Sequence, residues 1–419
     1  MCVLIQLFLT ASLLLCAYGI LFDEILPQYG RSLVLVGGNL ALNNSLIYHK
    51  IVTLAGGLGR AKLGIITAAS SNPEGSYTYY QEIFRSLGVL QTTYIPVSAT
   101  NSSLAQDPAT VQLIQTQTGF FFGGGDQYRI IQALKTDNGS STPALVALEE
   151  RFTKGAVIAG TSAGLACQTG TIMIRSGMSW ESLRHGAHDS YSASHPDDLV
   201  YEPRGGLGFI DGYLLDQHFS QRGREGRLIR LLADTRSGPL GTNRGVGVDE
   251  NTALVITHSG TPEARAEIIG QFGATFIDVS RASVINGSGY YDIRDIFVSY
   301  LTHGDEIFLS NMTITFSTSK TLMLGHEQYS RALTSADIFG GSRRNPDRKP
   351  EFVRAATSIF DSRLDRSTYG DTKKSNPRFR VTMARTGHDA EGWVERRSGF
   401  HSDITSYKNM YVEINELKV

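Results

Sequence analysis

Short apolar runs alternate with longer amphipathic stretches along the first 160 residues of the chain. Four runs of apolar and small residues each lead into glycine or small hydroxyl residues, and they lie at 33–36, 63–66, 120–122 and 156–159. Continuous apolar runs of this length are typical of strands buried on both faces. Stretches between them, such as 79–87 and 144–152, have the spacing of amphipathic helices. The alternation predicts an α/β fold, a three-layer αβα sandwich around a mostly parallel sheet.

The pattern changes in the second half of the chain. Residues 177–204 are rich in His, Ser and Asp, have little periodicity, and are interpreted as an insertion. Residues 268–316 contain short alternating segments, which predict an antiparallel edge of the sheet. Beyond Ser317 the composition becomes basic, with clusters at 340–350 and 373–380. We predict one domain over 31–316 and a C-terminal extension over 317–419, solvated and partly flexible, in preference to a polyanion site.

The N-terminus is apolar and uncharged through residue 22. Small residues in Ala17-Tyr18-Gly19 predict cleavage after Gly19, so that residues 1–19 form a signal peptide and the protein is secreted and extracellular. A membrane-tethered protein with an uncleaved signal anchor is the alternative, because the run is just long enough to span a bilayer.

Glycosylation motifs and cysteines agree with secretion. Candidate N-glycosylation sites occur at Asn43, Asn101, Asn138, Asn286 and Asn311. Removal of the signal would take two of the three cysteines with it and leave Cys167 alone, so no intrachain disulfide is expected.

Composition limits the choice of partner. The chain has 419 residues, 41% of them hydrophobic, and a formal net charge of −1. This apolar content is sufficient for a large core, and the balanced charge gives no general attraction to nucleic acid or an anionic membrane. The balanced charge favours a small-molecule or peptide partner; we expect no nucleic acid and no stable membrane partner, and a homodimer is left open.

The strongest chemical signal is Gly160-Thr161-Ser162-Ala163-Gly164, a G-x-S-x-G pentapeptide directly after a predicted strand and before a small-residue helix. Small flanking residues allow the tight turn of a nucleophile elbow, which lifts the serine hydroxyl above the sheet. The pattern predicts Ser162 as the nucleophile after a central strand, and the N–H of Ala163 as a donor to an oxyanion.

A second oxyanion donor is expected from the glycine-rich loop that ends the 120–122 strand, where Gly125 and Asp126 are the candidates. No Walker lysine follows this loop, and Gly37-Gly38-Asn39 does not complete a dinucleotide-binding motif. No metal or organic cofactor is expected.

A serine nucleophile needs a base and an orienting carboxylate. His218 follows an apolar stretch and is the candidate base, and Glu250 ends a predicted strand, with Asp249 as the alternative carboxylate. Arg222, Arg224 and Arg227 lie just past the histidine and form either a clamp for substrate carboxylates or a solvated helix start.

These motifs together resemble those of the cyanophycinase family of serine peptidases, relatives of the aspartyl dipeptidases. The matching motifs are TAASS at 67–71, GGDQ at 124–127, GTSAG at 160–164, DQHFSQRGR at 216–224 and GVGVDENTAL at 245–254. The loop at 37–40 departs from the family, which usually has an acid there.

The resemblance implies a fold like that of the class I glutamine amidotransferases, with serine replacing their cysteine, and a triad of Ser162, His218 and Glu250. It implies substrate-binding roles for six further positions, Gln127, Asp216, Gln217, Arg222, Arg224 and Arg227. The substrate it implies is cyanophycin, an aspartate backbone carrying arginine on its β-carboxyls, or a related β-aspartyl-arginine peptide.

The sequence therefore predicts a secreted serine-type exopeptidase that works through an acyl-enzyme on Ser162. One alternative is a dipeptidase acting on isoaspartyl or acidic peptides by the same mechanism. Another is a non-catalytic secreted binding protein that retains the fold.

Overall fold

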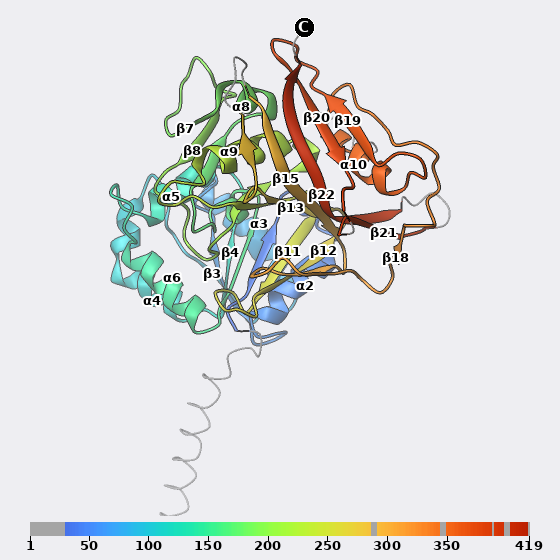
Figure 1. Cartoon of the computed structure of the whole chain (residues 1–419). Coiled ribbons are helices and arrows are strands. Elements are labelled where there is room, and N and C mark those ends of the chain that lie inside the picture. Colours follow the sequence, from blue (N-terminus) through green and yellow to red (C-terminus); the bar gives the residue numbers. More distant parts are fainter. Residues whose placement is uncertain (1–29, 286–290, 344–348, 388, 398–402, 418–419) are drawn as a thin grey trace, which may run out of the picture.

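The computed structural model describes residues 30–285, 291–343, 349–387, 389–397 and 403–417 (Figure 1). The predicted signal peptide and the sequon at Asn286 lie outside these residues. Within them, no helix combines the length and apolar character needed to cross a bilayer.

A nine-stranded sheet forms the centre of the first part of the chain. Its parallel strands lie in the order β1 (Leu33–Val36), β5 (Val157–Thr161), β4 (Gly119–Phe122), β2 (Lys62–Ile66) and β3 (Gln91–Tyr94). On the other side of β1 follow antiparallel strands β11 (Thr252–Thr257), β12 (Arg265–Gly270), β16 (Glu306–Phe308) and β17 (Ile314–Thr315). The four predicted strands are confirmed, and the antiparallel edge lies where the alternating segments near 307–315 predicted it.

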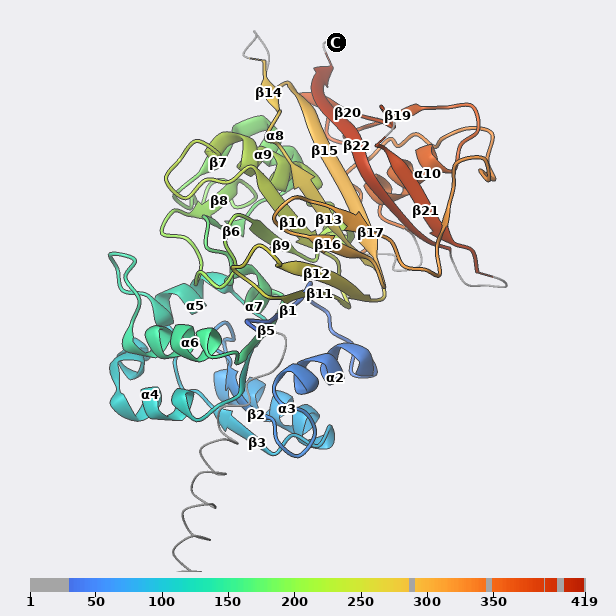
Figure 2. The same ribbon diagram turned by 60° about the horizontal axis from the view of Figure 1, so that its bottom comes forward.

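Helices cover both faces of the parallel strands (Figure 2). One layer holds α2 (Ser45–Leu54) and α3 (Pro73–Ser86); the other holds η1 (Ser102–Gln106), α4 (Pro108–Gln115), α5 (Gln127–Leu134) and α6 (Pro143–Thr153). Side chains of β1 alternate between the layers, because Val34 and Val36 belong to the core with α2 and α3, whereas Leu33 and Leu35 belong to the core with α4 to α6. This alternation confirms the three-layer αβα sandwich.

A second, ten-stranded sheet stands beside the first. Its main path runs β18 (Thr321–Leu322), β21 (Glu391–Glu395), β22 (Ile404–Leu417), β15 (Ile293–Thr302), β13 (Gly273–Asp278), β10 (Arg244–Val248) and β9 (Leu214–Gln217). The strands β14 (Ser283–Val284), β19 (Ser367–Asp371) and β20 (Arg378–Ala384) pair at its margins. Only β9 and β10 are parallel to each other among the neighbouring pairs of this sheet in the described residues.

The second sheet shares one core with the sandwich and has another of its own. Val246 and Val248 of β10 pack into the sandwich core. On the opposite face, Leu214 and Ile277 pack into a core that includes α8 (Ser179–His185), α9 (Glu225–Thr235) and α10 (Glu351–Phe360).

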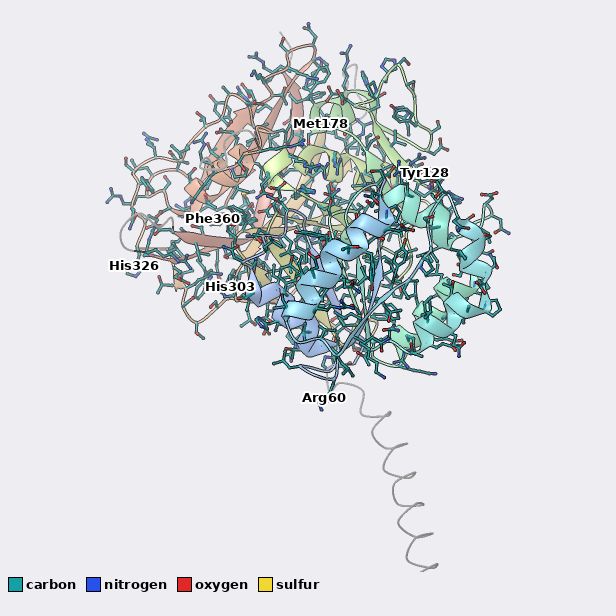
Figure 3. All side chains as sticks on the ribbon, turned by 180° about the vertical axis from the view of Figure 1, so that it is seen from behind. Arg60, Tyr128, Met178, His303, His326 and Phe360 are labelled. Carbon is teal, nitrogen blue, oxygen red and sulfur yellow. The ribbon has the colours of Figure 1, made fainter. Side chains whose placement is uncertain are left out.

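The C-terminal residues are an integral part of this second sheet, and the expectation of a solvated, partly flexible extension is wrong. β22 pairs with β15, β20 and β21, and α10 buries nearly its whole length. Part of the second basic cluster misled the prediction because it belongs to an amphipathic strand: in β20, Phe379, Val381 and Met383 are buried while Arg378 is exposed. Seen from behind, Phe360 at the end of α10 lies on the side opposite Tyr128 of α5 (Figure 3).

The predicted insertion contains ordered structure. α8, β7 (Ala187–His188) and β8 (Leu199–Glu202) lie within residues 177–204, and β8 pairs with both β7 and β6 (Met173–Ser176). The indole Nε1–H of Trp180 on α8 donates to the carbonyl of Pro377 at 2.9 Å, so this segment contacts the C-terminal strands. The domain limits at 31 and 316 and the insertion itself stay predictions.

Candidate active site

Ser162 occupies a sharp turn between β5 and the short helix α7 (Ala163–Ala166), with φ +55° and ψ −113°. A side chain at Gly160 would come within 2.2 Å of the Gly164 carbonyl oxygen, and one at Gly164 within 2.2 Å of the Phe122 carbonyl oxygen. Both flanking positions therefore require glycine, which is the steric reason for the G-x-S-x-G pattern. The strained backbone holds the hydroxyl above the carboxyl end of the sheet.

His218 directly follows β9 and is fixed by the loop after β1. Its backbone N–H donates to the Gly37 carbonyl at 2.6 Å. A Cβ atom at Gly38 would lie 2.3 Å from the imidazole Cε1, so the absence of a side chain at residue 38 makes room for the ring. In this position the imidazole Nε2 lies 2.9 Å from the hydroxyl of Ser162.

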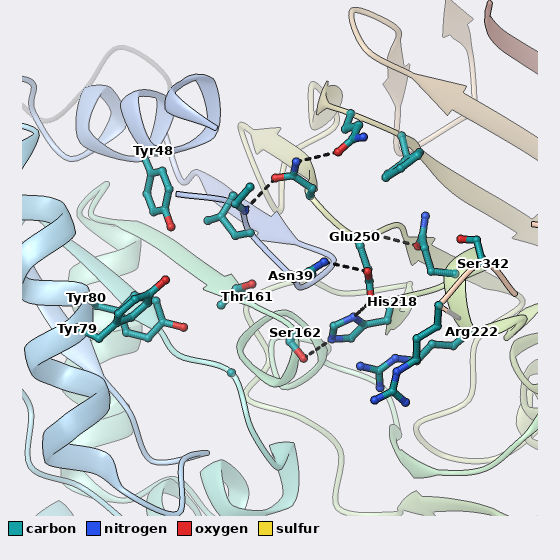
Figure 4. Close-up of a pocket in the computed structure, with 18 residues that line it drawn as sticks. Asn39, Tyr48, Tyr79, Tyr80, Thr161, Ser162, His218, Arg222, Glu250 and Ser342 are labelled. Atoms are coloured by element: carbon teal, nitrogen blue, oxygen red, sulfur yellow. Dashed lines mark hydrogen bonds and ion pairs between the residues drawn. The ribbon is translucent and has the colours of Figure 1, made fainter. Parts of the chain in front are cut away.

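Glu250 follows β10 and completes a hydrogen-bonded row of three side chains, Ser162, His218 and Glu250, called here the Ser–His–Glu row (Figure 4). Its Oε1 lies 2.5 Å from Nδ1 of His218, and its Oε2 accepts a hydrogen bond from Asn39 Nδ2 at 3.2 Å. Asp249, the alternative, is fully buried on the opposite side and accepts hydrogen bonds from Ser220 and Tyr300. The structure therefore places Glu250, and not Asp249, against the imidazole.

The electrostatics of the row suit a neutral imidazole that accepts a proton. Burial lowers the pKa of His218, and the charge of Arg222 lowers it further, while the Glu250 carboxylate acts in the opposite direction. The hydrogen bond from His218 is the main cause that lowers the pKa of Glu250. At neutral pH the carboxylate is ionised and Nδ1 carries the proton, which leaves Nε2 to accept from Ser162.

Strained backbone is concentrated around this row. Asn39, Ser162, His218 and Asn251 all have positive φ, between +46° and +55°, and all line the same cavity. Asn251 fixes the loop after β1, since its Oδ1 accepts from the Ala41 N–H at 3.1 Å. Sequence reasoning missed both asparagines; the available signal was an asparagine, which tolerates positive φ, next to a strand end.

The oxyanion prediction needs one correction. The Asp126 N–H donates to the Ala69 carbonyl at 3.0 Å, and the Asp126 carboxylate accepts from the Tyr128 N–H, so Asp126 caps α5 and its N–H is occupied. The neighbouring Gly124 lies beside the nucleophile instead: a Cβ there would be 3.4 Å from the Ser162 Cβ. Among the residues described, no hydrogen bond occupies the N–H of Ala163. Gly125 stays a predicted donor.

A cavity of about 840 Å³ opens in front of the row. Tyr48, Tyr79 and Tyr80, from α2 and α3, lie on one side of it, and Arg222 lies across from them (Figure 4). Arg343 also lines the cavity. The remaining lining residues come from strand-end loops and the C-terminal segment: Asn39, Leu40, Ala41, Gly124, Thr161, Ser162, His218, Gln221, Glu250, Asn251, Gln271, Phe272 and Ser342. The tyrosines and Arg343 were not predicted, because they lie far from the recognisable motifs.

The predicted substrate-binding residues divide into two groups. Arg222 lines the cavity, and Gln217 lies next to the nucleophile, with its Oε1 3.4 Å from the Ser162 hydroxyl. The side chain of Arg224 is 12% exposed, and its guanidinium donates to the backbone carbonyl of Gln217 at 2.6 Å. This hydrogen bond holds Gln217 in place.

Direct substrate contact is contradicted for the other three. Asp216 and Arg227 are 1% and 2% exposed and form a buried ion pair with each other. Gln127 is also buried, and its amide nitrogen donates to the Ile174 carbonyl at 2.8 Å. Their side chains hold the fold behind the site. No cluster of three or more His, Cys, Asp or Glu side chains suited to a metal ion occurs in the described part of the chain.

The α/β sandwich carries a hydrogen-bonded Ser–His–Glu row, the arrangement that serine-type peptidases use. The chain belongs to peptidase family S51, whose family model matches residues 33–263. The relationship to cyanophycinases read from the motifs is confirmed at this level.

Two proteins named cyanophycinase are similar in sequence to this chain. A cyanophycinase of Synechococcus elongatus is 31% identical over 233 residues, which cover 55% of this chain and 63% of that protein. A cyanophycinase of Geminocystis herdmanii is 29% identical over 288 residues, which cover 67% of this chain and 94% of that protein. The chain thus spans less than two thirds of the length of the first relative and most of the second.

A solved structure, that of a peptidase from an acI-B1 actinobacterium, also resembles the chain. It is 23% identical, with a TM-score of 0.44, over 67% of this chain and 97% of the other.

Proposed function

We propose that the protein hydrolyses peptide bonds through an acyl-enzyme on Ser162. The observation that supports this is the hydrogen-bonded row in which His218 Nε2 lies 2.9 Å from the Ser162 hydroxyl and Nδ1 lies 2.5 Å from Glu250. His218 takes the hydroxyl proton as the Ser162 oxygen attacks the scissile carbonyl carbon, and Glu250 stabilises the imidazolium that forms.

The same groups complete the cycle. The N–H of Ala163 and an N–H of the Gly124–Gly125 segment stabilise the negative charge on the tetrahedral intermediate. His218 then gives its proton to the leaving amine. A water molecule, deprotonated by His218, attacks the acyl-enzyme, and collapse of the second intermediate releases the acid and restores Ser162.

We propose cyanophycin, or a related β-aspartyl-arginine peptide, as the substrate. Such a peptide carries both carboxylates and guanidinium groups. The cavity offers a complement to each, because Arg222 and Arg343 suit a carboxylate and the tyrosines on the other side suit a guanidinium through cation–π contact. Relatives named as cyanophycinases support the same choice.

The test is turnover by a Ser162→Ala variant. Loss of the nucleophile should reduce the release of dipeptide from cyanophycin by roughly 10³-fold or more, measured by mass spectrometry. Alanine has no larger side chain than serine, so the circular dichroism spectrum and the melting temperature should not change. Ser237→Ala, at an exposed serine, is the matched control and should keep full activity. Undiminished turnover by Ser162→Ala would overturn the mechanism.

A dipeptidase acting on isoaspartyl or other acidic peptides is a second candidate, and the two arginines of the cavity favour it. The two candidate substrates differ at the tyrosines of the cavity. A β-aspartyl-arginine peptide has a guanidinium group that can contact them, and a purely acidic peptide has none. A panel of β-aspartyl-arginine and acidic dipeptides separates them by kcat/KM. A binding protein without activity would give no turnover on any of them and no covalent labelling of Ser162 by a fluorophosphonate.

We also propose that the protein is secreted after cleavage behind Gly19. The four sequon asparagines in the described residues are all exposed, as glycosylation requires: Asn43, Asn101, Asn138 and Asn311. N-terminal sequencing of protein released by cultured eukaryotic cells should begin at Ile20. Recovery only in the membrane fraction with residue 1 intact would support the signal anchor instead.

A further inference from the structure

A segment of the C-terminal part of the chain, residues 339–343, lies against the loop that carries the catalytic base. A Cβ atom at Gly223 would come within 1.9 Å of the Phe339 carbonyl oxygen, and one at Gly341 within 2.1 Å of the Gln221 carbonyl oxygen. The backbone N–H of Arg343 donates to the same Gln221 carbonyl at 3.1 Å. The segment is therefore held by backbone contacts close enough to require glycine on both sides.

Gln221 connects this segment to the Ser–His–Glu row. Its backbone carbonyl accepts from Arg343, and its side-chain Oε1 accepts from the backbone N–H of Glu250 at 3.0 Å. One residue thus fixes the positions of both the carboxylate and the C-terminal segment. Arg343 and Ser342 reach the edge of the cavity as a result.

Arg222 and Arg343 both line the cavity and lie near enough for their charges to repel each other. Among the residues described, neither guanidinium has an ion pair or a side-chain hydrogen bond, and the Nε of Arg222 is buried without a partner. Burial lowers the pKa of Arg222, and the charge of Arg343 is the next cause in the same direction. The carboxylates of Glu250 and Asp216 act in the opposite direction on Arg222, but neither forms an ion pair with it in the described residues. An anion that binds between the two guanidiniums would reduce their repulsion.

We propose that Arg343, supplied by the C-terminal segment, forms with Arg222 a two-arginine clamp that binds a carboxylate of the substrate beside the scissile bond. This inference rests on the proposed function and adds a specificity-determining residue to it. Residue 343 lies outside the part of the chain that matches the family, residues 33–263.

Within the part of the chain that the structure describes, the side chain of Arg343 forms no ion pair or hydrogen bond that would hold the fold. The contact that docks the segment uses its backbone N–H, which any residue except proline supplies. The residue itself is exposed and faces the cavity. A planar guanidinium offers paired donors to a carboxylate, and two of them can bind its two oxygens from different sides.

The clamp also sets the direction in which a substrate binds. Ser162 lies between the tyrosines and Arg222 (Figure 4). A substrate with a carboxylate at the arginines and a guanidinium at the tyrosines would therefore present the peptide bond between these groups to Ser162. In a β-aspartyl-arginine peptide the carboxylate has two sources, the terminal carboxyl of the aspartate backbone and the α-carboxyl of the arginine branch.

The experiment uses a short synthetic peptide of aspartates carrying arginine, prepared as the free acid, with the backbone terminus amidated, or with the arginine carboxyls amidated. For the unchanged protein, one of the two amides should have a KM about tenfold or more above that of the free acid, because a charge-assisted bidentate contact is lost. The amidated peptide with the raised KM shows which of the two carboxylates the arginines bind. Arg343→Ala should raise KM for the free acid by a similar factor and add little for that amide, and Arg343→Lys should recover part of the loss.

An equal effect of Arg343→Ala on all three peptides, or no effect, would overturn the clamp. Arg378→Ala removes one exposed positive charge from the same part of the chain and should leave every KM unchanged. If the unchanged protein cleaves none of the peptides, the proposed function fails. Calorimetric titration of the Ser162→Ala variant with the free acid and both amides then tests the clamp by itself, with the same order of affinities expected.

Discussion

At the scale of single residues, opposing charges around the His218 imidazole set its pKa. His218 contacts a carboxylate on one side and has Arg222 and Arg224 nearby on the other. Burial and the arginines favour the neutral ring, whereas Glu250 favours the protonated ring. Because burial is the largest cause, the pKa lies below the ordinary value of 6.5, and the base is ready to accept a proton at neutral pH.

Arg222→Gln should move the acid limb of the pH profile. In the unchanged protein kcat/KM rises with pH as His218 loses its proton, with a midpoint below 6.5. Removing the Arg222 charge takes away a cause that lowers this pKa, so the midpoint should shift to higher pH. The measurement is kcat/KM for a dipeptide substrate between pH 4 and 8.

Arg343→Gln is the matched control for this profile. It also removes one positive charge from the cavity, but that charge is not among the main causes that act on His218. For Arg343→Gln, the midpoint of the rise of kcat/KM with pH should therefore stay close to that of the unchanged protein, even though KM rises. A shift to lower pH in Arg222→Gln, or the same shift in both variants, would contradict the electrostatic account.

The sequence predicted which three side chains the fold brings together because each stands directly after an apolar run. Ser162, His218 and Glu250 could be found in this way. Arg343 could not, since its place depends on a segment folding back across more than a hundred residues to Gln221. The choice between Glu250 and Asp249 was also open, because both are acids at the same strand end and only the tertiary contacts separate them.

At the scale of elements, the site is assembled by strand pairing. β9 and β10 are parallel, with Gln217 opposite Val248, so the residues that follow these two strands emerge side by side. β1 and β5 are parallel too, with Val36 opposite Thr161, which brings the loop after β1 next to the elbow. The two pairs belong to different sheets, and the contact of His218 with Gly37 and Gly38 connects them.

The elements themselves were largely predictable, but the second sheet was not. Buried parallel strands have continuous apolar runs that stand out in a sequence. β22 carries a weaker pattern, because Asn409 has φ +54° and the pairing with β15 shifts register between Val298 and Tyr300. A bulge of this kind breaks the alternation from which a strand is recognised.

Gly341→Ala tests the docking of the C-terminal segment as an element. The added methyl would lie 2.1 Å from the Gln221 carbonyl oxygen, so the segment must move away. The variant keeps Arg343 but displaces it, and kcat/KM for the free-acid peptide should fall about tenfold, the loss expected for one charge-assisted contact.

The amidated peptides and a second glycine provide the control for this variant. The fall should be smaller for the peptide whose clamped carboxylate is amidated. Gly325→Ala is the matched control in the same part of the chain, since a Cβ there meets no atom within 4 Å although its φ of +82° adds some strain. Equal kinetics for Gly341→Ala and the unchanged protein would show that the segment does not position a substrate-binding residue.

At the scale of the whole molecule, a buried ion pair connects the C-terminal part to the rest of the structure. Lys320 Nζ donates to the Asp305 carboxylate at 2.6 Å, and both side chains are fully buried. The other Asp305 oxygen accepts from the hydroxyl of Ser406 at 2.5 Å. One carboxylate thereby joins the turn after β15, the start of the C-terminal part and β22.

This arrangement predicts that the C-terminal part unfolds together with the sandwich. Lys320→Met should destabilise the protein by about 3–5 kcal/mol, because it leaves the buried charge of Asp305 without its cation. The loss should appear in urea denaturation as a lower midpoint of one cooperative transition, followed both by far-UV circular dichroism and, with Trp180 replaced by Phe in every protein compared, by the fluorescence of Trp393 in the C-terminal part.

Two further variants decide the cause of that loss. Lys373→Met removes an exposed lysine and should leave the midpoint unchanged. Asp305→Asn combined with Lys320→Met removes both charges while the amide oxygen can still accept hydrogen bonds, so the pair should recover part of the lost stability. If Lys320→Met instead produced an early transition seen only by Trp393, the C-terminal part would be a separate unit, and its contribution to the active site would depend on docking rather than on a shared core.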